Sequence, residues 1–464
     1  MYFFAKYKNN LPIVISTTLY LYFAYFVQRT DFTFLLFLWL FLFGCFFWLL
    51  KDNSLNSKNL IGAAVFFRVL FLFAAPNLSQ DFYRFIWDGR MLLEGFNPYL
   101  YLPESFIHNG IEPINQATLL YQGMGQLNGS HYTNYPPVNQ LCFFLAALIA
   151  NKSILASTIA LRCIIILADI GIIYTGKKLL ERLNLPVKNI YFYALNPFII
   201  IELTGNLHFE PVMLFFLILS LYKLHKHKWV LAAVFLACSI SVKLIPLLFV
   251  PIFFQWFTQP HKNKNNLKKN LFKENFTIKN LSRLFGFYSI IFFTVLLFFL
   301  PFYNSNLITN YSNSLGLWFG NFEFNASFYY IFRQIGYLFR GYNEIAVIGK
   351  ITPILTIVFL LFLTFFKENK SLEKVFTAML FAICFYYFTA TTVHPWYLAT
   401  PVVLSVFTSY RFPVIWTFTV VLSYQAYSNI PRKENLWLVG IEYALLFGFM
   451  FFERYQKKYH IKLN

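Results

Sequence analysis

Apolar runs long enough to cross about 30 Å of hydrocarbon recur from one end of the chain to the other. In lipid each such run must be helical, because a helix satisfies its own backbone N–H and C=O groups. The pattern therefore predicts an all-α fold: a polytopic transmembrane helical bundle of about 12–14 spans, with a large outer loop that bears interfacial helices. The expected spans are residues 11–27, 31–50, 59–76, 154–176, 188–205, 209–224, 228–241, 243–257, 284–304, 347–366, 375–392, 396–410, 412–427 and 436–452.

Composition agrees with a membrane protein that carries very little soluble mass. Of the 464 residues, 58% are hydrophobic, 22% aromatic and 12% charged, whereas a soluble domain carries about twice that charged fraction. The formal net charge is +19, but the basic residues lie in short connectors, so we expect no nucleic-acid partner. The cysteines lie within apolar runs and lack the spacing of a disulfide framework or a zinc site. They are Cys45, Cys142, Cys163, Cys238 and Cys384.

Two connectors of opposite character predict the orientation. Segment 258–283 is basic, whereas segment 77–136 holds more acids than bases. By the positive-inside rule the first is cytoplasmic and the second lies outside. The basic residues of the first are Lys262, Lys264, Lys268, Lys269, Lys273, Lys279 and Arg283, and the acids of the second are Asp81, Asp88, Glu94, Glu104 and Glu112.

Six apolar runs lie between these two connectors, but opposite sides require an odd number of crossings. The run at 137–150 is the best candidate not to cross, because it is short and is opened by Pro136 and Pro137. The loops at 206–210 and 394–396 then lie at the outer face. Both termini lie in the cytoplasm, and we expect a multi-pass protein of a bacterial inner membrane.

The stretch from Ser79 to Arg90 is the most informative one for chemistry. As a helix it would place Asp81, Arg84 and Asp88 on one face, because they are three and four residues apart. Its apolar residues suit the membrane interface, so an acid would be held just above the bilayer. From these residues alone, an ordinary interfacial helix with solvated charges fits equally well.

Several short motifs follow one another between residues 75 and 250. They are Asp81-x-Tyr83-Arg84-x-x-Trp87-Asp88-Gly89, Gly95-x-Asn97-Pro98-Tyr99, Tyr135-Pro136-Pro137, Asn196-Pro197 and His208-x-Glu210. In these motifs the sequence resembles the C-type glycosyltransferase superfamily, and within it the bacterial mannosyltransferase-like branch, family 87. The first motif is the specific one. The chain departs from the usual pattern in having Glu210 where Asp is usual after the His.

The resemblance implies inverting transfer of a sugar, mannose or a similar monosaccharide, from a polyprenyl-phosphate donor to a lipid or glycan acceptor on the outer side of the membrane. In that superfamily a carboxylate of the first large outer loop is the catalytic base, and the matching position here is Asp81. The resemblance also divides a single membrane-embedded domain, residues 1–464, into four parts. These are N-terminal spans (1–58), a catalytic module (59–257), a basic cytoplasmic loop (258–283) and a C-terminal helical bundle (284–464).

This chemistry makes physical sense for the residues present. A lipid phosphate is a competent leaving group, and a carboxylate that takes the proton of the acceptor hydroxyl contributes about 10²–10⁴ in rate. Asp88 is the second carboxylate of the catalytic set, and we expect it to orient Arg84 rather than to take the proton. The departing phosphate needs cations or hydrogen-bond donors. The candidates for substrate binding are Arg84, Arg90, His208, Glu210, Lys243 and His394, and for each the alternative is an ordinary interface residue.

Charged residues also occur inside the predicted spans. Arg162 and Asp169 are seven residues apart on one helical face, and a structural polar contact within the bundle is the expected role, as for Arg68. The absence of an outer DxD motif and of a Gly-rich phosphate loop agrees with a lipid-linked donor. The sequence assigns no metal ligand and no cofactor, although Asp81 and Asp88 could hold a divalent cation with His208 or Glu210.

A transporter or flippase of a lipid-linked sugar or another solute is the main alternative function. Arg162, Asp169 and Lys243 would then be the coupling or substrate residues. Transporters commonly show repeated halves and broken helices at the midplane, whereas this chain shows no repeat and places its acid cluster beside an outer loop. A catalytically inactive scaffold is a third possibility.

Overall fold

The computed structural model describes residues 10–52, 55–258, 277–320, 322–429 and 433–459, and these residues form helices. Strand pairing among them is limited to one isolated bridge between Phe324 and Thr392. The predicted all-α fold is therefore confirmed. The first part of the chain forms α2 (Leu11–Phe26), α3 (Phe32–Lys51), α4 (Ser57–Val69), α5 (Asp81–Leu93), α6 (Pro103–His108), α7 (Ala117–Gly129), α8 (Pro137–Ile149), α9 (Ile154–Arg182), η2 (Val187–Ile190), α10 (Tyr191–Ala194), η3 (Ile199–Gly205), α11 (Glu210–His225), α12 (Trp229–Val242), η4 (Ile245–Phe253) and α13 (Phe254–Thr258).

The second part follows the basic segment. It forms α14 (Ile278–Phe299), η5 (Leu300–Phe302), α15 (Leu307–Gly320), α16 (Phe328–Arg340), α17 (Ile345–Phe366), α18 (Leu372–Thr389), η6 (Pro395–Leu398), α19 (Ala399–Val406), α20 (Phe412–Thr419), η7 (Val420–Ser428) and α21 (Leu436–Lys458).

Six of the described helices are long and apolar enough to cross a membrane, and a seventh span is possible if η3 and α11 count as one bent pair. These six are α3, α9, α14, α17, α18 and α21. The expected spans at 188–205, 243–257, 396–410 and 412–427 are built instead from short α, 3₁₀ and π segments. Prolines explain part of this, since they remove backbone donors and break regular helix. They occur at Pro197, Pro246, Pro251, Pro395, Pro401 and Pro413.

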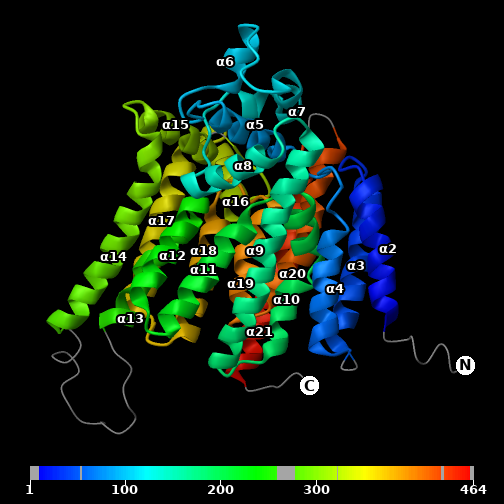
Figure 1. Ribbon diagram of the computed structural model, residues 1–464. Coiled ribbons are helices and arrows are strands. Elements are labelled where there is room, and N and C mark those ends of the chain that lie inside the picture. Colours follow the sequence, from blue (N-terminus) through cyan, green and yellow to red (C-terminus); the bar gives the residue numbers. More distant parts are fainter. Residues whose placement is uncertain (1–9, 53–54, 259–276, 321, 430–432, 460–464) are drawn as a thin grey trace, which may run out of the picture.

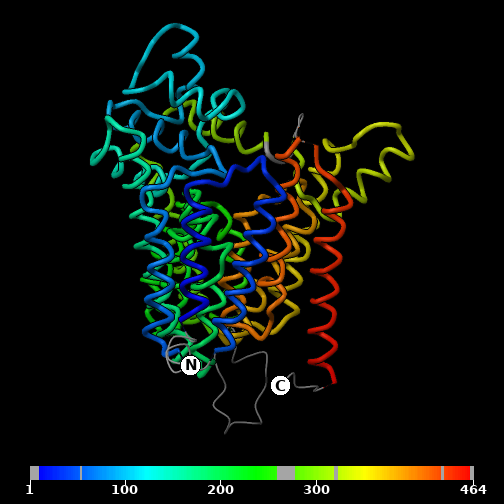
Figure 2. Tube along the Cα trace, turned by 90° about the vertical axis from the view of Figure 1, so that its right-hand side faces the viewer, coloured from blue at the N-terminus to red at the C-terminus, as the bar shows by residue number. Residues whose placement is uncertain are grey.

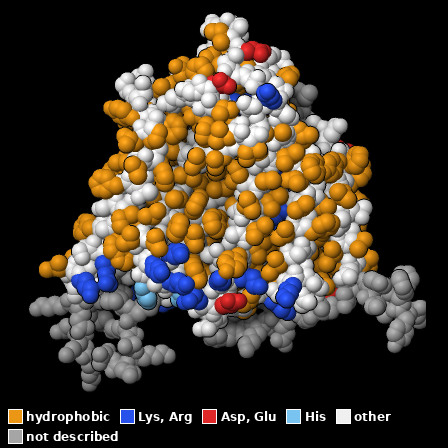
Figure 3. Space-filling view, viewed as in Figure 1, with side chains coloured by type: hydrophobic (Ala, Val, Ile, Leu, Met, Phe, Trp, Pro, Cys, Tyr) orange, Lys and Arg blue, Asp and Glu red, His pale blue; other side chains and the backbone are white. Residues whose placement is uncertain are grey.

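The helices form a bundle that carries a cap at one end (Figures 1 and 2). Helices α5, α6 and α7 make this cap, while α2 begins and α21 ends at the opposite end. Hydrophobic side chains cover the middle of the face seen in Figure 3, and most of its Lys and Arg side chains gather at the end opposite the cap. This distribution is the one the positive-inside rule expects if the cap lies outside.

Helix α8, which covers the run predicted not to cross, lies beneath α5 at the capped end (Figure 1). It packs closely on α5, where Phe85 and Phe143 stack with ring centroids 4.7 Å apart. Gly89 permits this approach, because a Cβ there would lie 2.3 Å from the carbonyl oxygen of Phe143. The glycine of the first sequence motif thus allows the cap helix α5 to pack closely on α8.

Two arginines buried in the bundle have polar partners. The Nε of Arg68 lies 2.7 Å from Oδ2 of Asp169, and both side chains are fully buried. Arg162 donates to the carbonyl oxygens of Leu72, Thr204 and Gly205 at 2.8, 2.9 and 3.0 Å. The contacts that the sequence predicted for these residues are therefore present, and they stabilise the junction of α4, α9 and η3.

Cysteine accessibility tests the predicted orientation. Asn109, after α6, and Lys279, in the first turn of α14, are both exposed and lie on either side of the apolar middle. We expect Asn109→Cys to react with a membrane-impermeant maleimide in intact cells and Lys279→Cys to react only after lysis. The reverse pattern would invert the orientation. The loop 258–283 itself lies largely outside the described residues.

Candidate active site

Asp81 is the first residue of α5, at the surface between the cap and the bundle. Its backbone N–H donates to Oγ of Ser79 at 3.2 Å, and its carboxylate hydrogen-bonds the side chain of Asn128. A carboxylate in the first turn is also favoured by the helix dipole. Burial raises the pKa of Asp81, while the Lys243 ammonium acts in the opposite direction. Asp81 thus lies within electrostatic reach of Lys243, although 162 residues separate them in the chain.

A bent helix pair lies within electrostatic reach of Asp81, through Glu210 at the start of α11. Helix η3 is a π-helix, in which the N–H of Asn206 donates to the carbonyl of Ile201 at 3.0 Å, and the chain then bends by 111° into α11. Leu207 adopts a φ of +61° at this bend, a conformation that costs about 1–3 kcal/mol for a non-glycine residue and that clusters at functional sites. His208 follows directly.

Asn206 connects this bend to the segment that precedes Asp81. Its Oδ1 accepts hydrogen bonds from the backbone N–H groups of Asn77 and Leu78 at 3.1 and 2.8 Å. Arg29, in the turn after α2, holds the same segment through the carbonyl of Leu78 at 3.4 Å and Oε1 of Gln80 at 3.2 Å. The position of Asp81 relative to the bend is therefore fixed by side chains that the sequence motifs did not single out.

Lys243 and Glu210 form an ion pair within electrostatic reach of Asp81. The Nζ of Lys243 lies 2.5 Å from Oε1 of Glu210, and the exposed fractions of the two side chains are 19% and 3%. Lys243 ends α12 in extended conformation, and Glu210 begins α11. The second carboxylate oxygen of Glu210 is buried without a hydrogen-bond partner among the described residues. A charged amine and an unsatisfied acceptor are thus held near Asp81.

The two histidines expected at the outer face both stack on one tryptophan. His208 stacks on Trp396 with ring centroids 3.9 Å apart, and His394 stacks on the same ring at 4.5 Å. His394 also stacks on Phe324 at 5.4 Å, in the loop that is bridged to Thr392. This row of rings joins the loop after α15 to the bend at His208.

Glu202 is a carboxylate of this region that the sequence analysis missed. It is fully buried in η3, accepts a hydrogen bond from the hydroxyl of Tyr424, and places Oε2 3.8 Å from Nε2 of His208. The sequence did contain a signal for Glu202, because an acid within an apolar run is energetically costly unless it is paired or has a function. Trp396, Tyr397 and Asn128 were missed as well, and a single uncharged residue in a loop gives no comparable signal.

Arg84, Asp88 and Arg90 are engaged within the cap, where Arg84 also donates to the backbone carbonyl of Asn128 at 2.6 Å, the residue whose side chain hydrogen-bonds Asp81. Arg84 lies 2.8 Å from Asp88, whose other oxygen accepts from Gln140 of α8 at 3.0 Å. Arg90 donates to the carbonyl of Asn115 at 2.5 Å. These contacts hold α5 against α7 and α8, and the structure thus places the candidates in two sets. The set around Asp81 comprises His208, Glu210, Lys243 and His394.

Among the described residues, no group of three or more His, Cys, Asp or Glu side chains is arranged to hold a metal ion. Asp88 in particular is engaged by Arg84 and Gln140. The geometry therefore offers an acid, an amine and imidazoles to a substrate, as general acid–base and anion-binding chemistry requires.

Comparison with known proteins decides the family. A family model described as "Alpha-(1->6)-mannopyranosyltransferase, N-terminal domain" matches residues 6–259, more than half of the 464 residues. The chain belongs to this family of mannosyltransferases. The resemblance to the C-type glycosyltransferases of family 87 is thereby confirmed.

A curated member of the mannosyltransferase family gives a weaker match. The protein named alpha-(1->6)-mannopyranosyltransferase A of Corynebacterium glutamicum is 24% identical over 199 residues, which make up 41% of this chain and 37% of that protein. The match thus covers little more than a third of the relative's length. All the candidate residues except His394 lie within the family-matched segment, while Trp396 and Tyr397 lie beyond it.

Proposed function

We propose that this protein transfers a sugar, mannose in the first place, from a polyprenyl-phosphate donor to a glycan or lipid acceptor on the extracytoplasmic face, with inversion at the anomeric carbon. The observation that carries the proposal is that Asp81, at the start of the cap helix, faces the Lys243–Glu210 pair and the bend at His208. Membership of a mannosyltransferase family supports the sugar. The positive charge at the opposite end of the bundle supports the face.

In this mechanism Asp81 takes the proton of an acceptor hydroxyl as its oxygen attacks the anomeric carbon. The bond from that carbon to the phosphate oxygen breaks, and polyprenyl phosphate leaves with the electron pair. Lys243 stabilises the charge that develops on the phosphate, because a charge-assisted hydrogen bond is about twice as strong as a neutral one. His208 and His394, which both stack on Trp396, supply further hydrogen-bond donors to the phosphate.

The position of the site also suits a lipid substrate. Asp81 begins α5, a helix of the cap that lies at the end of the apolar bundle (Figure 1). A phosphate bound at Lys243 would leave the polyprenyl chain in the hydrocarbon layer, where each buried CH₂ contributes about 0.8 kcal/mol. Arg84, Asp88 and Arg90 stabilise the cap in this proposal, and Arg84 and Asp88 do so as a pair.

Purified protein in lipid vesicles tests the proposed function directly. It is incubated with radiolabelled polyprenyl-phosphate mannose, with other polyprenyl-phosphate sugars in parallel, and with a membrane extract as acceptor. We expect label to pass to an extractable glycan or glycolipid. Label that accumulates unchanged inside sealed vesicles would favour transport and contradict the proposal.

A further inference from the structure

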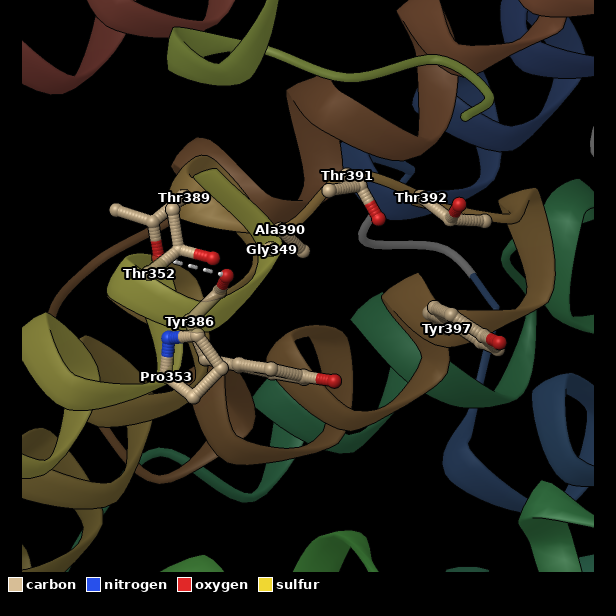
Figure 4. Close-up of a pocket in the computed structure, with 9 residues that line it drawn as sticks. All are labelled: Gly349, Thr352, Pro353, Tyr386, Thr389, Ala390, Thr391, Thr392 and Tyr397. Atoms are coloured by element: carbon tan, nitrogen blue, oxygen red, sulfur yellow. Dashed lines mark hydrogen bonds between the residues drawn. The ribbon is translucent and has the colours of Figure 1, made fainter. Parts of the chain in front are cut away.

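A cavity opens beside the candidate active site, in the half of the chain that the family model does not reach. It lies between the first turns of α17 and the end of α18, is open at its mouth and holds about 50 Å³ of space for water-sized groups. This exceeds the roughly 10–15 Å³ that a single water needs, and the open mouth leaves room for a larger ligand to extend outward. Its lining residues are Gly349, Thr352, Pro353, Tyr386, Thr389, Ala390, Thr391, Thr392 and Tyr397 (Figure 4).

The lining is rich in hydroxyl groups and uncharged. Thr389 and Thr392 use their hydroxyls within the protein, donating to the carbonyl oxygens of Phe385 at 3.0 Å and Phe322 at 2.8 Å. The hydroxyls of Tyr386, Thr391 and Tyr397 make no hydrogen bond to a described residue. Each of these oxygens is at least partly accessible, since none is among the fully buried polar atoms that lack a partner. They remain available to a ligand in the cavity.

The cavity is connected to the candidate active site through Tyr397. Its hydroxyl lies close enough to Glu210 and Asp81 for their charges to act on it, and it is also within reach of Tyr386. Tyr397 is the neighbour of Trp396, on which His208 stacks. A ligand seated against Tyr397 would therefore lie next to His394, whose ring centroid is 5.4 Å from that of Tyr397, and within electrostatic reach of the proposed base.

We propose that this cavity binds a neutral hexosyl unit during the reaction, an inference that rests on the proposed function. Uncharged hydroxyl donors and acceptors suit the hydroxyls of a sugar. Burying a phosphate among uncharged groups would leave its charge without a partner, which is costly. The tyrosine rings offer apolar faces next to their polar ends, as the two sides of a pyranose require. The sugar comes either from the donor or from the end of the acceptor.

Steady-state kinetics distinguish these two sources. The variant Tyr386→Phe/Thr391→Val removes two free hydroxyls with little change of shape, and Thr364→Val is the matched control, since Thr364 is buried at the far end of α17. The assay measures transfer from polyprenyl-phosphate mannose to octyl α-mannoside. We expect the KM for one substrate to rise about 5- to 100-fold, because each lost hydrogen bond changes affinity a few-fold to about tenfold.

A rise confined to the acceptor KM assigns the cavity to the acceptor sugar, and a rise confined to the donor KM assigns it to the donor sugar. Values of both KM within twofold of those of Thr364→Val would overturn the proposal. A binding experiment keeps this result separate from the proposed function. Saturation-transfer NMR with methyl α-mannopyranoside should show contact with the wild-type protein and lose it in Ala390→Leu, whose side chain fills the cavity.

Should the wild type transfer no sugar from any lipid-linked donor, the proposed function fails, and the NMR experiment still decides the cavity. Equal saturation transfer in Ala390→Leu and wild type would then show that the sugar binds elsewhere. Loss in Ala390→Leu with retention in Thr364→Val would support a sugar site that serves another reaction.

Discussion

Asp81→Asn is expected to reduce sugar transfer by about 10²–10⁴-fold while leaving expression and fold unchanged. The amide is nearly isosteric with the carboxylate but cannot accept the hydroxyl proton. Because Asp81 contacts Asn128 and Ser79 at the edge of the cap and forms no ion pair with a described residue, the substitution leaves the packing of α5 in place. The measurement is kcat and both KM values with polyprenyl-phosphate mannose in vesicles. We expect kcat to fall and the donor KM to stay near its wild-type value.

Asp88→Asn is the matched control for this prediction. It removes a carboxylate from the same helix, but one that lies 2.8 Å from Arg84 and is completely buried. We expect loss of stability there, because one partner of a buried charge pair is left alone, with partial activity in the protein that folds. An inactive Asp88→Asn beside an active Asp81→Asn would exchange the two roles. Full activity in both would move the base to Glu210, or to Glu323 in the loop after α15, which pairs with Arg333 at 2.5 Å.

The fold was predictable because a membrane imposes few solutions. Long apolar runs such as 31–50, 154–176 and 436–452 became α3, α9 and α21, since hydrocarbon forces each to satisfy its own backbone. Runs broken by proline were predicted as spans but form short segments. The amphipathic α16 was not predicted either. Its exposed apolar face, with Leu338 and Phe339 among the most exposed residues, is typical of a helix at the membrane interface.

The local sequence pattern pointed to the candidate site only where a charged residue lies in or beside an apolar run. The family resemblance, rather than the local pattern, identified Asp81 as the proposed base, whereas an amine between two apolar runs identified Lys243. Glu202 obeys the same rule and was overlooked within the run 188–205. Trp396 and Tyr397 give no comparable sequence signal, because aromatic residues are common throughout this chain. Their proposed role follows from the stacking of His208 on Trp396 and from the effect of the Glu210 charge on Tyr397, which no local pattern encodes.

Lys243→Met is expected to lower kcat/KM for the lipid-linked donor about 10- to 150-fold. The variant keeps the length of the side chain but loses the charge, and hydrogen bonds to charged groups contribute about 1.5–3 kcal/mol. The loss should appear in the donor KM as well as in kcat, since a phosphate is charged both before and during transfer. A donor kcat/KM within threefold of wild type would place the phosphate elsewhere.

A second variant separates this effect from the partner of Lys243. Lys243→Met leaves the buried Glu210 carboxylate unpaired, which by itself destabilises the bend at His208. The double variant Lys243→Met/Glu210→Gln removes both charges. We expect it to restore the thermal stability of the protein in detergent but not the donor kcat/KM. Recovery of both would mean that Lys243 serves only to neutralise Glu210.

The pH profile of Lys243→Met provides the strictest check, because it links the amine to the proposed base. Burial raises the pKa of Asp81, and the Lys243 ammonium opposes that rise. Without the ammonium the pKa of Asp81 must be higher. A base acts in its deprotonated form, so activity rises with pH through this pKa. The acid limb of kcat/KM should therefore move to higher pH in Lys243→Met, and it should move back in part in the double variant, since Glu210 also raises the pKa of Asp81. An acid limb that stays in place in both variants would mean that the titrating group is not Asp81.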